Sequence, residues 1–125
     1  MLRSPYYPGN YPKNRDCVYL ISQPVGKAIQ LDFIDFDIEA AYDSRCLFDF
    51  LEIRDGDNEN STLIGHYCGG NVPETILSSM NYLWIRFKTD GSLQNKGFIA
   101  NFSTIDVGCG GILRGSKMGK KLSLK

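Results

Sequence analysis

The feature that most constrains the fold is a series of short segments in which apolar and polar residues alternate, separated by turn-forming residues. In residues 27–33, for example, Ile29, Leu31 and Phe33 alternate with polar neighbours, which is the period of a half-buried strand. No 11-residue window carries the apolar stripe of an amphipathic helix. The pattern therefore predicts an all-β fold, an antiparallel sandwich or barrel. The expected strands are residues 17–22, 27–33, 47–56, 62–70, 81–92 and 97–104.

The alternation changes phase once, directly after the second of these segments. Phe33 is followed by Ile34 rather than by a polar residue, and Phe36 and Ile38 then continue the apolar series. A single extra residue in a strand has this effect, so the sequence predicts a β-bulge near residues 33–34.

The charge distribution limits the kind of partner. The chain is formally neutral, yet residues 1–108 contain 14 acidic and 9 basic residues, and residues 109–125 contain 5 basic residues and no acid. An acidic domain is a poor binder of nucleic acid, because phosphate contacts require a basic face. It is suited instead to cations, either metal ions or the lysine and arginine side chains of other proteins.

The cysteines and sequons indicate an extracellular setting. There is no C-x-x-C pair and only one histidine, which disfavours a zinc site. Four cysteines in a small domain favour an oxidising compartment, and two N-x-S/T sequons agree with it. No apolar run is long enough to enter a membrane, and a secretion signal would belong to a longer precursor. The residues concerned are Cys17, Cys46, Cys68, Cys109, His66 and the candidate glycosylation sites Asn60 and Asn101.

Residues 34–50 contain five carboxylates among apolar side chains, and three interpretations are open: solvated strand edges, a catalytic pair, or a calcium site. Catalysis is disfavoured because a compact sandwich offers little room for a cleft, and a single histidine supports no nucleophile–histidine arrangement. An EF-hand loop starting at Asp35 is excluded because Ala40 and Cys46 occupy the required glycine and glutamate positions. A calcium site would therefore combine carboxylates from separate loops.

Six motifs, in order and spacing, resemble the CUB domain family between Ser4 and Thr104. The resemblance implies a compact, jelly-roll-like sandwich of two antiparallel sheets, in agreement with the strand pattern. The motifs are SPYYPGNYPKNRDC, DFIDFDIE, CLFDFLEIRDG, YCGG, LWIRFKTDGS and KGFIANF.

The resemblance also implies the disulfide pairing and the domain organisation. Family members usually pair the first cysteine with the second and the third with the fourth, and Cys17, Cys46 and Cys68 match the last three of these. A Cys46–Cys68 disulfide is thus implied, and Cys17 lacks its partner. Cys109, in GCGGIL, resembles the opening cysteine of a following domain. We expect a CUB domain at 1–108, without its Cys-Gly-Gly opening, and at 109–125 the truncated start of a second, with a disordered basic tail.

The calcium-binding members of the family imply a ligand set. Glu39, Asp49 and Asp90 match their three acidic ligands, the carbonyl of Ser92 matches a fourth, and Tyr11 matches a tyrosine that supports the acids by hydrogen bonding. One position departs from the pattern, since Leu93 replaces a frequent asparagine.

The implied function is that of a non-enzymatic extracellular module. Lysine or arginine side chains of protein ligands would dock on Glu39, Asp49 and Asp90 when Ca²⁺ is bound. The implied context is a tandem array with neighbouring CUB domains, as in an endocytic receptor for intrinsic factor–vitamin B12 and other proteins. Two alternatives remain open: a structural spacer within such an array, and the partner-selecting domain of a secreted protease.

Overall fold

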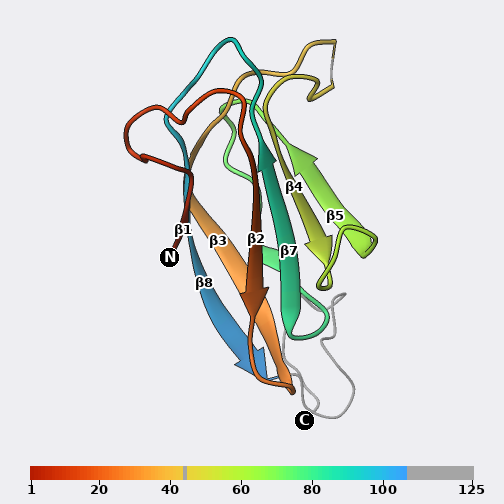
Figure 1. The fold of residues 1–125 in the computed structure, drawn as a ribbon. Coiled ribbons are helices and arrows are strands. Elements are labelled where there is room, and N and C mark those ends of the chain that lie inside the picture. Colours follow the sequence, from red (N-terminus) through yellow and green to blue (C-terminus); the bar gives the residue numbers. More distant parts are fainter. Residues whose placement is uncertain (44, 107–125) are drawn as a thin grey trace.

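The computed structural model describes residues 1–43 and 45–106 of the 125-residue chain. These residues form eight strands: β1 (Leu2–Arg3), β2 (Asp16–Ser22), β3 (Lys27–Asp37), β4 (Phe50–Asp55), β5 (Thr62–Tyr67), β6 (Ile76–Leu77), β7 (Tyr82–Lys88) and β8 (Gly97–Asp106). One sheet has the order β1-β8-β3-β6 and the other the order β2-β7-β4-β5, and every pairing is antiparallel. The sheets pack as two layers of a sandwich, which confirms the expected fold class (Figure 1).

The core lies between the sheets and is built from the alternating residues that the sequence singles out. On β7, Leu83, Ile85 and Phe87 all have no exposed surface. The ring of Phe87 meets the ring of Phe98, from β8 in the opposite sheet, edge to face with a centroid distance of 5.2 Å. Such contacts between the inner faces stabilise a sandwich because each aromatic side chain removes a large apolar area from water.

The expected bulge is present in β3. The pairing of β3 with β8 skips one residue between Phe33 and Asp35, so Ile34 is left out of the register and lies exposed. Because of this extra residue, Phe36 still points into the core beyond the bulge.

Several strands are shorter than the alternation suggests, and two were not anticipated. β4 occupies only Phe50–Asp55 of the expected 47–56, and β5 and β7 end at Tyr67 and Lys88. β1 and β6 have two residues each, which is too short for any periodicity to be visible. The expected disordered tail, Cys109 and the expected second domain at 109–125 lie outside the described residues.

The strand directions bring four chain segments to one end of the sandwich. β3 and β7 finish at this end, and β4 and β8 begin there (Figure 1). The β3–β4 and β7–β8 connections therefore meet the loop before β2, and these three connections carry the residues discussed next. No helix among the described residues is long and apolar enough to cross a membrane.

Candidate metal centre

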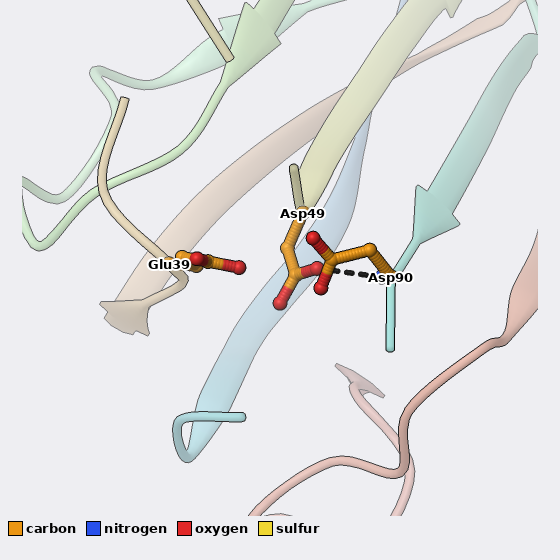
Figure 2. Close-up of side chains that lie close together, drawn as sticks. All are labelled: Glu39, Asp49 and Asp90. Carbon is orange, nitrogen blue, oxygen red and sulfur yellow. Dashed lines mark hydrogen bonds between the residues drawn. The ribbon is translucent and has the colours of Figure 1, made fainter. Parts of the chain in front are cut away.

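Three acids that are far apart in the sequence converge at this end. Glu39 lies two residues after β3, Asp49 directly precedes β4, and Asp90 lies two residues after β7. One carboxylate oxygen from each lies within 4.8 Å of the other two. Figure 2 shows the Glu39 side chain pointing toward those of Asp49 and Asp90 from the opposite side of the cluster.

Two of the three acids are withdrawn from solvent. Asp49 has no exposed surface and Glu39 is only 9% exposed. Burial, with the nearby charges of Asp90 and Asp49, raises the pKa of Glu39. Burial also raises the pKa of Asp49, although the hydroxyl of Tyr11 and the backbone N–H of Asp90 act in the opposite direction. Carboxylates held together in this way repel one another unless a cation compensates their charge.

Tyr11 connects the cluster to the hydrophobic core. Its hydroxyl donates to Oδ2 of Asp49 at 2.6 Å and accepts the backbone N–H of Glu39 at 3.2 Å. Its ring packs edge to face on Phe87, with a centroid distance of 5.0 Å. Oδ1 of Asp49 accepts the backbone N–H of Asp90 at 2.7 Å. The orientation of Asp49 is therefore fixed at both carboxylate oxygens.

One carboxylate oxygen of the cluster has no partner. Oε1 of Glu39 is buried and makes no hydrogen bond within the described part of the chain. A buried oxygen without a donor costs free energy, so this atom favours a ligand that accepts its lone pairs. Ca²⁺ is bound by oxygens at about 2.3–2.6 Å, and two oxygens on opposite sides of the ion are then roughly 5 Å apart. The 4.8 Å limit of the cluster fits a cation of this size.

Ser92, the last residue of the implied set, and Leu93, which departs from the family pattern, lie on the β7–β8 loop. The N–H and the hydroxyl of Ser92 donate to Oδ1 of Asp90 at 3.1 and 3.2 Å, which places Ser92 beside the cluster. Its expected role through the backbone carbonyl stays a prediction. Leu93 is 64% exposed on the same loop and has no polar group to offer a metal ion.

The loops that carry the acids are tied to one another. Buried Thr89 accepts the N–H of Arg15 at 2.8 Å through its hydroxyl, which also donates to the carbonyl of Pro12 at 2.9 Å. The N–H of Asn14 donates to the carbonyl of Asp90 at 2.8 Å. The loop before β2, which contains Tyr11, is thus attached to Thr89 and to Asp90 itself.

The β3–β4 connection is bonded to the two residues that follow β5. The disulfide Cys46–Cys68 is formed, which confirms the expected pairing. Ile38 and Gly69 exchange two backbone hydrogen bonds of 3.0 Å just before Glu39. Cys17 is half-buried on β2 and is not bonded to another described cysteine. Both ends of the segment that carries Glu39 and Asp49 are consequently held in place.

Sequence reasoning missed two features of this end of the molecule. The carboxylate of Asp35, expected to be an ordinary solvated acid, accepts the hydroxyl of Tyr7 at 2.6 Å and lies 3.0 Å from Nζ of Lys96. Thr89 was not singled out at all. The sequence alone contains no signal for either feature. A threonine before an aspartate predicts no contact, and neither does a tyrosine 28 residues from an acid.

Comparison with known families identifies the family of this chain. The family model described as the CUB domain matches residues 1–102. The chain belongs to the CUB domain family. Among relatives, cubilin of Rattus norvegicus is 48% identical over 113 residues, which cover 90% of this chain and 3% of that protein. Tolloid-like protein 2 of Mus musculus is 50% identical over 101 residues, which cover 81% of this chain and 10% of that protein.

Solved CUB structures share the fold. The CUB2 domain of MASP-1, solved bound to Ca²⁺, superposes with a TM-score of 0.73 at 34% identity, covering 81% of this chain and 88% of that one. The CUB1-EGF-CUB2 region of human MASP-1/3 gives a TM-score of 0.74 at 28% identity, covering 85% of this chain and 41% of that one. As a CUB domain with relatives in cubilin and tolloid-like proteins, the chain is supported as a protein-interaction module of extracellular proteins.

Proposed function

We propose that this CUB domain binds Ca²⁺ through Glu39, Asp49 and Asp90 and thereby captures lysine or arginine side chains of protein ligands. The observation that carries the proposal is the convergence of three carboxylates, two of them buried, one of which has a buried oxygen without a hydrogen-bond partner. The Ca²⁺-bound MASP-1 CUB2 domain, of the same fold, supports it. Calcium would supply the positive charge that offsets the repulsion among the acids.

The burial of each acid suggests its role in binding the ion and the protein ligand. Asp49 and Glu39 are buried and would face the ion, while Asp90 is half-exposed and can also present oxygen to an incoming cation. The carbonyl of Ser92 would be the fourth protein ligand. Tyr11 would keep Asp49 and Glu39 in position through the hydrogen bonds of its hydroxyl. Three carboxylates around one divalent ion leave a net negative charge, which attracts a basic side chain and makes binding sensitive to salt.

The biological setting is part of the proposal. Similarity to cubilin favours a place in a tandem CUB array of an extracellular or cell-surface protein, with neighbouring CUB domains as contacts and uptake of intrinsic factor–vitamin B12 as a candidate process. Similarity to tolloid-like protein 2 keeps the alternative of a secreted protease domain. Asn60 and Asn101 are exposed and lie outside the loops that carry the carboxylates, so N-glycans there would leave the site accessible.

A calcium titration by calorimetry tests the central claim. We expect saturable binding with a Kd of about 10⁻⁴–10⁻³ M, the range of extracellular modules. Asp90→Ala should abolish it, whereas Asp57→Ala, in the exposed β4–β5 turn, should not. Retention on immobilised polylysine should follow the same pattern and disappear on chelation. Calcium binding that persists in Asp90→Ala, or retention that ignores chelation, contradicts the proposal.

A further inference from the structure

Exposed apolar residues neighbour each carboxylate of the candidate site in the chain. Tyr42, Leu47 and Leu93 are 63%, 51% and 64% exposed. Each of them is within three residues of one acid: Tyr42 follows Glu39, Leu47 precedes Asp49, and Leu93 follows Asp90. Since three residues of extended chain span at most about 11 Å, the Cα atom of each lies within that distance of the Cα atom of an acid of the cluster.

The two leucines lie in segments that are already fixed. The N–H of Leu47 donates to the carbonyl of Arg45 at 3.0 Å, and Leu47 stands between the disulfide cysteine Cys46 and buried Asp49. Two residues after Leu93, the carbonyl of Asn95 accepts the N–H of Tyr11 at 3.0 Å. A partner that covers these leucines would therefore lose little conformational entropy in ordering them.

A carboxylate cluster with exposed apolar residues close to it in the chain has a complementary partner. The side chains of lysine and arginine consist of a long apolar stem with a charge at its tip, so the tip can reach the acids while the stem contacts the leucines. Apolar groups that surround an ion pair also exclude water from it, which strengthens the pair and adds buried apolar area. A basic residue among polar neighbours would leave Leu47 and Leu93 in contact with water.

We infer that this site selects a basic side chain that is flanked by apolar residues on the partner, with Leu47 and Leu93 as the specificity-determining contacts. The inference rests on the proposed function, and it adds the chemistry of the partner's surface around the captured cation. Charge complementarity sets the sign of the partner's charge, and the two leucines, two and three residues from acids of the cluster, offer the apolar contacts.

Two end-blocked peptides immobilised on a sensor surface test this inference, Gly-Leu-Lys-Leu-Gly and Gly-Ser-Lys-Ser-Gly, with the whole chain flowed over them in saturating calcium. We expect the leucine peptide to bind about 25-fold more tightly, because each of the two leucines of the site contributes about fivefold. Burial of roughly half a leucine side chain corresponds to about a fivefold change in Kd, so Leu93→Ser and Leu47→Ser should each reduce the preference by about that factor. Val25→Ser is the matched control, because Val25 is 92% exposed in the turn between β2 and β3, away from the cluster.

The outcomes separate the two claims. Equal binding of both peptides, lost for both on chelation, overturns the selection of apolar neighbours and leaves the proposed function standing. A leucine preference that survives in both leucine variants, or that falls equally in Val25→Ser, also overturns it. If neither peptide binds in a calcium-dependent manner, the proposed function fails and the inference fails with it. Should Leu47→Ser unfold the loop beside the disulfide, Leu93→Ser alone decides, with its calcium affinity measured to show that the site is intact.

Discussion

The hydroxyl of Tyr11 donates a hydrogen bond of 2.6 Å to Oδ2 of Asp49, across 38 residues of sequence. Tyr11 joins the hydrophobic core to the carboxylate cluster, because its ring packs on Phe87 while its hydroxyl also accepts the N–H of Glu39. Two of the three acids therefore depend on one oxygen atom for their position.

Tyr11→Phe should retain the ring packing and lose only this oxygen. The change leaves a buried carboxylate oxygen and a buried N–H without a partner, so we expect the free energy of unfolding to fall by about 1–3 kcal/mol. Urea denaturation in the absence of calcium measures it. Tyr19→Phe is the control, because the Tyr19 hydroxyl makes only a 3.4 Å contact with the exposed carbonyl of Arg3. Equal losses in the two variants would show that the Tyr11 hydroxyl has no special role.

Glu39→Gln should act in opposite directions with and without calcium. In the metal-free protein the substitution removes one of three mutually repelling charges at a buried position, and each neighbouring carboxylate within 4.8 Å contributes on the order of 1 kcal/mol. We therefore expect a higher melting temperature in chelator. In calcium the order should reverse, because the variant lacks a charged ligand and is no longer stabilised by the ion.

Thermal melts of both proteins, with and without calcium, measure the reversal. The control is Glu59→Gln, an exposed acid in the β4–β5 turn, which should change neither melt. Parallel shifts of Glu39→Gln under both conditions would indicate that the carboxylate is structural and does not bind the metal.

Thr89→Val should weaken calcium binding without touching a ligand. The variant keeps the shape of the side chain and removes the hydroxyl that connects Arg15 and Pro12 to the residue before Asp90. Because a partly buried N–H and a partly buried carbonyl lose their partner, stability should fall by about 1 kcal/mol, and the loosened Tyr11 loop should raise the calcium Kd by about tenfold. Calorimetry measures the affinity, and Thr89→Ser, which keeps the hydroxyl, should restore most of it. An unchanged Kd in Thr89→Val would mean that the hydrogen bonds of the Thr89 hydroxyl contribute to stability alone.

The fold was predictable because its signals are local. The alternation of Leu83, Ile85 and Phe87 identifies a half-buried strand regardless of what it pairs with, and the change of phase after Phe33 reports a bulge without knowledge of the partner strand. β1 and β6 were missed for the same reason, since two residues carry no period and exist as strands only because β8 and β3 offer them hydrogen bonds.

The site was only partly accessible from the residues themselves. Composition and spacing pointed to a loop-assembled cation site, but the choice of Glu39, Asp49 and Asp90 came from the resemblance to the CUB family. Asp35 illustrates the difficulty. It has the same residue type and a similar neighbourhood to Asp49, yet it is bound by Tyr7 and Lys96 on the outer face of the sheet. Which acids converge depends on contacts between residues tens of positions apart, and no local pattern encodes these.

The stability contributed by Asp35 should depend on pH in a direction set by its partners. The hydroxyl of Tyr7 and then the ammonium of Lys96 lower the pKa of Asp35. A carboxyl whose pKa is lower in the folded than in the unfolded state stabilises the fold above its unfolded pKa, about 3.9, and loses this contribution as the pH falls through the folded value. Wild type should therefore exceed Asp35→Asn in urea midpoint at neutral pH, and the two should converge below about pH 3.

Urea titrations at both pH values measure the difference in midpoint, with Glu59→Gln as a control that shows none. A difference in urea midpoint between wild type and Asp35→Asn that stays constant down to low pH would contradict this. It would mean that Asp35 acts through the shape of its side chain and its neutral hydrogen bonds, and that its charge does not contribute to stability.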